Sequence, residues 1–143
     1  MANTIEWDKK YSVGVPELDQ FQKELLDKFN QLIGLKTKKV DVKAVTNLIS
    51  DINDYSKMFF SKEEKLLKAN KYPDLEPHSK AHRQFIKNSI ALRREIAEDI
   101  NNLTMETILE LRDWLVDHIE TSDSLYVPFL RINQYIKDSQ QKN

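Results

Sequence analysis

The sequence predicts an all-α protein, folded as an antiparallel up-down four-helix bundle with an N-terminal extended arm and a short C-terminal helix. Three observations predict this class. The 143 residues include only two glycines and four prolines, which favours long helices over a turn-rich β fold. Apolar residues recur at steps of three and four in four successive segments. The joins between these segments are short, as is typical of helices that run antiparallel to their neighbours.

The first two helices follow a segment without helical periodicity. Residues 1–16 lack such a period and are expected to form the extended arm. The first helix then shows an apolar face from Leu18 to Ile33. Asp41 is the expected N-cap of the second helix. This helix should end near Asn70, because residues 72–77 contain two prolines that cannot lie in a helix interior.

The remaining helices are delimited in the same way. The third helix should begin close to Pro77 and end before residues 99–104. Thr104 is a suitable cap for the fourth helix, whose apolar face ends at His118. A last helical segment extends from about residue 122 to residue 137 and contains a proline.

Composition and charge narrow the function classes. With 40% hydrophobic and 31% charged residues, we expect residues 1–143 to form a single domain. A net charge of −1 gives no electrostatic reason to expect nucleic acid or membrane partners. The absence of cysteine excludes disulfides and thiolate metal sites. We expect a cytoplasmic protein, because the N-terminus lacks the apolar core of a signal peptide and no apolar run is long enough to span a membrane.

Polar residues interrupt the apolar faces near one end of the predicted bundle. A carboxylate is seldom buried without a partner. Glutamate and histidine side chains that project inward from facing helices are a usual way to build a metal site in a bundle core. The interrupting residues are Gln22, Glu63, His78, His82, His118 and Asp123.

The spacing of these residues supports a metal site. His78 and His82 are four residues apart, so both imidazoles lie on one face of the third helix. In an antiparallel bundle, His118 at the end of the fourth helix and Glu63 late in the second lie level with them. A single inward histidine is more often a packing residue than a ligand. The convergence of all three histidines of the chain with two carboxylates, Glu63 and Asp123, favours the metal interpretation.

Four segments of the chain resemble the motifs of bacterial hemerythrin. The resemblance covers nearly the whole sequence and suggests a single hemerythrin-like domain. The histidines lie in the third and fourth segments. The second segment, residues 59–67, matches a motif that normally reads H-F-x-x-E-E. The segments are WDKKYSVGVPELD (residues 7–19), FFSKEEKLL (59–67), YPDLEPHSKAH (72–82) and WLVDHIETSD (114–123).

The resemblance implies a set of iron ligands. In this family two irons in the bundle core bind O2 reversibly; one iron takes three histidines, the other takes two, and a glutamate and an aspartate bridge them. By position, the three-histidine iron corresponds to His78, His82 and His118, and the bridges correspond to Glu63 and Asp123.

The two ligands of the second iron are replaced. The helix-one ligand falls on Gln22 and the helix-two histidine falls on Phe59. Phenylalanine has no donor atom, and a glutamine carbonyl is a weak ligand for a divalent ion. In the family, the second iron carries the open position where O2 binds. We therefore expect impaired reversible O2 carriage.

The expected cofactor is iron, with one ion favoured over two. Such a protein would act in small-ligand sensing, with O2 or NO as the ligand, or in iron handling. One alternative is a full diiron O2-binding protein; another is a metal-free bundle that acts through protein contacts. No residue pattern indicates substrate recognition, so we do not expect an enzyme, and the sequence identifies no protein partner.

Overall fold

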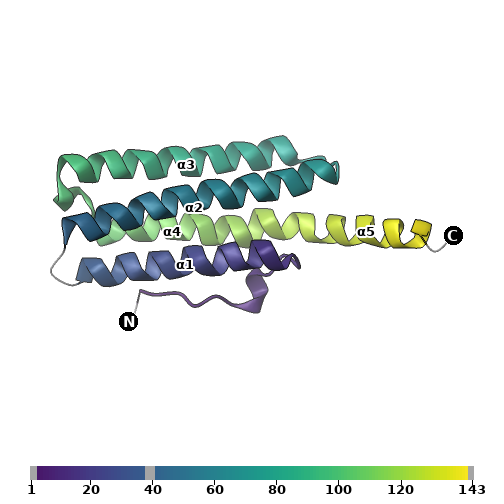
Figure 1. Cartoon of the computed structure of the whole chain (residues 1–143), viewed down its shortest axis with the longest axis horizontal. Coiled ribbons are helices and arrows are strands. Elements are labelled where there is room, and N and C mark those ends of the chain that lie inside the picture. Colours follow the sequence, from purple (N-terminus) through teal and green to yellow (C-terminus); the bar gives the residue numbers. More distant parts are fainter. Residues whose placement is uncertain (1–2, 38–40, 142–143) are drawn as a thin grey trace.

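Four long helices run alternately up and down the bundle in the computed structural model, which describes residues 3–37 and 41–141 (Figure 1). Each long helix packs on two neighbours, in the cyclic order α1, α2, α3, α4. This arrangement confirms the predicted antiparallel bundle. The elements are η1 (Lys9–Tyr11), α1 (Pro16–Thr37), α2 (Val42–Ala69), α3 (Leu75–Glu98), η2 (Ile100–Asn102), α4 (Met105–His118), η3 (Ile119–Asp123) and α5 (Ser124–Gln141).

The helix ends follow local capping chemistry. Asp41 accepts a hydrogen bond from the backbone two residues later, and Thr104 forms a capping box, so both predicted caps are confirmed. α3 begins at Leu75, two residues before Pro77. A proline is tolerated there because first-turn N–H groups have no intrahelical acceptor. α1 continues past Gly34 and ends at Thr37.

The N-terminal arm is tied to α1, alongside which it runs in Figure 1. The backbone N–H and C=O of Ile5 both bond to the Asn30 side chain, at 3.0 and 2.9 Å. Asp19 accepts hydrogen bonds from the Ser12 hydroxyl and from the backbone N–H of Val13. Gly14 has a φ of +75°, which only glycine adopts readily, and this turn directs the arm into α1.

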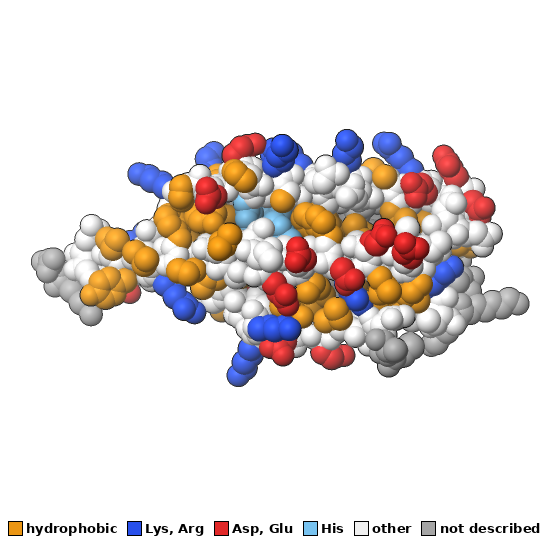
Figure 2. Space-filling view, turned by 180° about the vertical axis from the view of Figure 1, so that it is seen from behind, with side chains coloured by type: hydrophobic (Ala, Val, Ile, Leu, Met, Phe, Trp, Pro, Cys, Tyr) orange, Lys and Arg blue, Asp and Glu red, His pale blue; other side chains and the backbone are white. Residues whose placement is uncertain are grey.

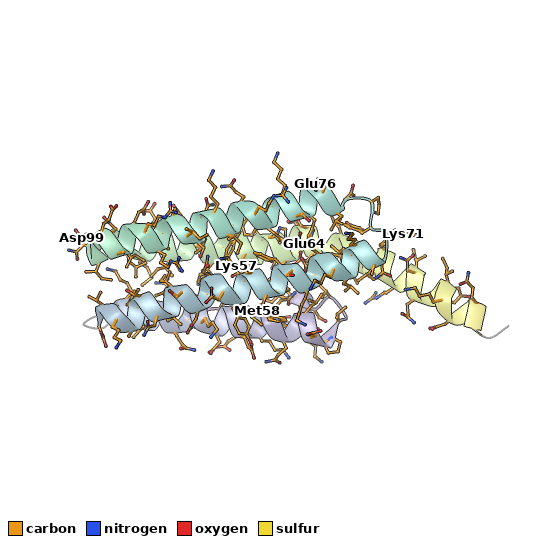
Figure 3. The ribbon with its side chains drawn as sticks, turned by 45° about the horizontal axis from the view of Figure 1, so that its top comes forward. Lys57, Met58, Glu64, Lys71, Glu76 and Asp99 are labelled. Carbon is orange, nitrogen blue, oxygen red and sulfur yellow. The ribbon has the colours of Figure 1, made fainter. Side chains whose placement is uncertain are left out.

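The fourth and fifth helices are joined without a loop. The π-helical turn η3 connects them, so that α5 prolongs α4 and projects past the end of the bundle (Figures 1 and 3). Pro128 lies inside α5. No helix in the described part of the chain combines the length and apolar content needed to cross a membrane.

The core is apolar along most of the bundle and polar near one end. Leu25, Phe29, Val45, Ile108 and Leu115 are fully buried. Toward the end where α2 connects to α3, buried residues become carboxylates and histidines. The bundle therefore gathers its buried histidines and carboxylates in one layer.

Candidate metal centre

Five residues predicted from the sequence meet in this layer, and we call them the His/carboxylate cluster. Glu63 comes from α2, His78 and His82 from the first turns of α3, His118 from the end of α4 and Asp123 from the end of η3. All five are buried, and the two carboxylates have no exposed surface. One potential ligand atom from each lies within 4.8 Å of the others, which is close enough for one cation to contact all five.

The π turn brings His118 and Asp123 together. Five residues of an ordinary α-helix span about 500°, so the two side chains would diverge by about 140°. The wider π turn reduces this angle, because it inserts one extra residue per turn. His118 Nε2 consequently lies 3.2 Å from Asp123 Oδ1. This geometry is typical of the functional π turns found inside α-helices.

The nitrogens and oxygens of the cluster approach one another closely. His78 Nε2 lies 2.6 Å from Glu63 Oε1, in hydrogen-bond geometry, and 3.1 Å from Asp123 Oδ1. His82 Nε2 lies 3.0 Å from the same Glu63 oxygen. Yet His82 Nε2, His118 Nε2 and both Asp123 oxygens make no hydrogen bond within the described chain. Buried polar atoms that converge without hydrogen bonds are costly unless a cation joins them.

Two further residues fix the orientation of the cluster. His82 Nδ1 donates to Glu64 Oε2 at 2.9 Å, because an ionised carboxylate can only accept. The ring therefore turns its Nε2 toward the cluster. The Tyr126 hydroxyl donates to Glu63 Oε2 at 2.8 Å, so that Glu63 presents Oε1 to the histidines. Neither role was predicted from the sequence. The second glutamate of the family-like E-E pair was a signal for Glu64, whereas the contact of Tyr126 depends on the π turn η3, which the sequence does not reveal.

Aromatic rings hold two of the imidazoles. Phe60 stacks on His82, with ring centroids 4.0 Å apart and an interplanar angle of 7°. Trp114 stacks on His118, with centroids 4.9 Å apart and an angle of 8°. Both rings exclude water from the faces that they cover and restrict imidazole rotation. The cluster is thus held in place before any ion binds.

The cluster strongly perturbs its own protonation. Burial opposes ionisation of Glu63, but the hydrogen bond from His78 and the adjacent His82 imidazole lower its pKa to about 2. Burial likewise opposes the charged form of His78, but Asp123 and Glu63 raise its pKa to about 9. Burial and the adjacent Glu63 carboxylate raise the pKa of Tyr126, so its hydroxyl keeps its proton. A cation that binds here must displace the proton held by the His78–Glu63 pair.

Gln22 and Phe59 both engage other residues. Gln22 is fully buried on α1, and its Oε1 accepts a hydrogen bond from Trp7 Nε1 at 3.0 Å. Phe59 is fully buried on α2 and lies between Phe21 and Phe60, with centroid distances of 5.9 and 5.5 Å. The Gln22 Nε2 atom has no hydrogen-bond partner in the described chain. Neither residue directs a free donor atom of the kind that iron prefers toward the cluster.

The cluster lies close to the molecular surface. Figure 2 shows histidine atoms at the surface on the face opposite to that of Figure 1, surrounded by hydrophobic side chains. His78 and His118 are 6% and 5% exposed, whereas Glu63 and Asp123 are completely covered. The imidazole side of the cluster therefore lies nearer to solvent than its carboxylate side.

Known proteins resemble this chain in sequence and in fold. The model of the hemerythrin HHE cation binding domain matches residues 13–130. A bacteriohemerythrin of Stenotrophomonas maltophilia is 28% identical, with coverage of 95% of this chain and 89% of its own. A myohemerythrin of Theromyzon tessulatum is 27% identical, with coverage of 85% and 89%. A crystal structure of wild-type hemerythrin superposes with a TM-score of 0.80 at 24% identity, with coverage of 87% and 95%.

The match to the family model spans most of the chain. It agrees with the resemblance to hemerythrin that the sequence motifs indicate. The structural neighbours have the same helical-bundle fold. A buried group of histidines and carboxylates lies in the core, as a cation-binding domain requires. The chain belongs to the hemerythrin family of non-heme iron-binding proteins.

Proposed function

We propose that the His/carboxylate cluster holds a single iron ion, with His78, His82, His118, Glu63 and Asp123 as the ligand set. The main support is the group of buried nitrogens and oxygens that converge without hydrogen bonds. Three imidazoles and two carboxylates supply five donors, which suits a six-coordinate ferrous ion with one position left open. When bound, the ion would supply that open position to a diatomic ligand such as O2 or NO.

The contacts of Gln22 and Phe59 support one ion over two. The Gln22 carbonyl oxygen already accepts the Trp7 indole hydrogen bond. The Phe59 ring offers no donor and packs on Phe21, at the helix position where the family has a histidine. A second ion would therefore lack both of its terminal protein ligands. Because reversible O2 carriage in the family uses two irons, we assign this chain a role in small-ligand sensing or iron handling.

The surrounding residues orient the proposed ligands. Glu64 holds the Nδ1 proton of His82, which leaves the Nε2 lone pair free for an ion. Tyr126 holds one oxygen of Glu63 and leaves the other toward the cluster. Such supporting contacts typically change metal affinity by about 10- to 100-fold.

Iron stoichiometry tests this proposal. Wild-type protein would be loaded anaerobically with Fe(II), desalted and analysed by plasma mass spectrometry, next to a Gln22→His/Phe59→His variant. We expect about one iron per wild-type chain and more than one per variant chain. An Asn47→His variant, with the new histidine on an exposed turn of α2, controls for adventitious binding. Two irons per wild-type chain would favour the diiron alternative, and none would favour a metal-free bundle; either result would overturn the proposal.

A further inference from the structure

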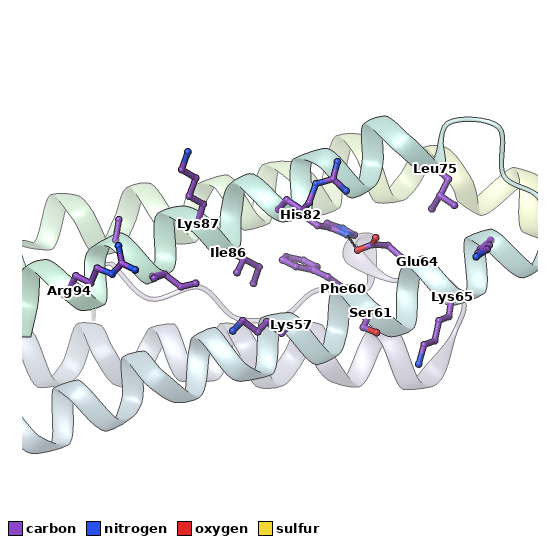
Figure 4. Close-up of a pocket in the computed structure, with 14 residues that line it drawn as sticks. Lys57, Phe60, Ser61, Glu64, Lys65, Leu75, His82, Ile86, Lys87 and Arg94 are labelled. Carbon is purple, nitrogen blue, oxygen red and sulfur yellow. Dashed lines mark hydrogen bonds and ion pairs between the residues drawn. The ribbon is translucent and has the colours of Figure 1, made fainter.

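A groove of about 770 Å³ runs along the outer side of the bundle between α2 and α3 (Figure 4). Its floor is apolar and consists of Phe60 from α2 with Leu75, Ile86 and Ile90 from α3. Figure 4 shows Phe60 and Ile86 pointing into the space between the two helices. The volume lies within the range of about 300–1,000 Å³ that is typical of small-molecule sites.

The rim of the groove is strongly cationic. One acidic residue, Glu64, lines the groove, and it already accepts a hydrogen bond from His82. Figure 3 shows Glu64 and Lys57 along the stretch of α2 that borders the groove. The basic residues that line the groove are Lys57, Lys65, Lys68, Arg83, Lys87 and Arg94.

Most of these cations lack an intramolecular counterion. Arg83 pairs with Glu76 at 2.9 Å, but the other five make no ion pair within the described residues. Elsewhere, Lys62 pairs with Glu17 on α1 and Lys10 pairs with Glu120. The protein carries nearly equal numbers of acidic and basic residues, so a groove with six cations and one carboxylate is a local excess.

We propose that this groove binds an amphipathic anion, specifically a long-chain carboxylate. Its alkyl chain would cover the apolar floor, and its carboxylate would pair with lysine or arginine on the rim. A partner protein fits less well, because 14 residues line the groove, whereas each side of a stable protein–protein interface supplies about 20–30. Nucleic acid fits less well still, since an apolar floor offers no partner to phosphates or base edges.

This site is separate from the proposed iron position, although the two share a wall. His82 lines the groove on one side and directs its Nε2 into the His/carboxylate cluster on the other. The proposal rests on the floor and rim of the groove and does not depend on bound metal. Binding should therefore be measurable in both metal-free and iron-loaded protein.

The test uses a fluorescent fatty acid, cis-parinarate, displaced by dodecanoate below its micellar concentration. We expect saturable binding of about one molecule per chain with a dissociation constant in the micromolar range. Dodecanol should compete at least tenfold more weakly than dodecanoate, because it lacks the charge. Acetate should not compete, because it lacks the chain.

Charge-reversal variants locate the site. A Lys87→Glu/Arg94→Glu variant should weaken dodecanoate binding at least tenfold and leave the helical circular dichroism spectrum unchanged. Ile90→Glu, which puts a carboxylate on the floor, should weaken it as well. Lys80→Glu is the matched control, since Lys80 is exposed on α3 and does not line the groove. Absence of saturable binding, equal competition by dodecanol, or equal affinity of the Lys87→Glu/Arg94→Glu variant and wild type would overturn the proposal.

Discussion

Glu64 offers a graded test of how the protein orients its proposed metal ligands. Its Oε2 atom accepts the His82 Nδ1 proton at 2.9 Å, and its side chain is 33% exposed. In Glu64→Gln the amide oxygen can still accept this proton, but the charge assistance disappears. A hydrogen bond to a charged group contributes about 1.5–3 kcal/mol, and a neutral one about 0.5–1.5 kcal/mol.

The charged hydrogen bond of Glu64 and the neutral one of the glutamine variant should differ by about 1 kcal/mol, because partial exposure screens the charged bond. We therefore expect Glu64→Gln to bind metal about fivefold more weakly than wild type. Glu64→Ala removes the acceptor altogether and should approach the 100-fold end of the range for such supporting contacts. The graded order, wild type then glutamine then alanine, is the signature of an orienting hydrogen bond.

Affinity would be measured by competition between the protein and a chromophoric chelator for Zn²⁺, which avoids oxidation during the titration. Glu76→Gln is the control, because Glu76 is an exposed α3 carboxylate that forms its ion pair with Arg83. Its affinity should equal that of wild type. If Glu64→Ala also bound Zn²⁺ as tightly as wild type, the proposed role of Glu64 would be refuted.

Three further changes probe the same layer. Tyr126→Phe should lower the free energy of unfolding of metal-free protein by about 1.5–3 kcal/mol in urea, because it removes the buried hydrogen bond to Glu63; no change would show that water replaces the hydroxyl. Inserting one alanine after Thr121 in η3 should rotate Asp123 relative to His118 by about 100° and abolish Zn²⁺ binding while helix content is kept; retained affinity would show that Asp123 is dispensable. His78 has a folded pKa of about 9, above its unfolded value, so its stabilisation is complete below about pH 6.5. The stability of chelator-treated protein should fall as the pH rises from 6.5 through 9, and a flat urea midpoint would contradict this.

The fold could be predicted because apolar periodicity and capping residues are local properties of the chain. Asp41 and Thr104 cap helices by bonds to residues two and three positions away, so their roles are readable from sequence. The inward position of His78 and His82 likewise follows from their spacing on one helix. These features need no knowledge of tertiary structure.

Other features of the site depend on contacts between distant segments. The hydrogen bond from Trp7 to Gln22 depends on how the arm runs along α1, which periodicity does not specify. Tyr126 reaches Glu63 across 63 positions of the chain. The π turn before it changes which residues of the last helix face the core, so an α-helical projection misplaces Tyr126.

The central claim, one ion in a three-histidine half-site, is tested most directly by native mass spectrometry of the iron-loaded wild-type chain. This measurement resolves each bound ion as a discrete mass increment on the intact protein. We predict that the dominant species carries one iron at saturating Fe(II), and that a His118→Ala variant carries none under the same conditions. A dominant wild-type species with two irons, or one with no iron, would contradict the account.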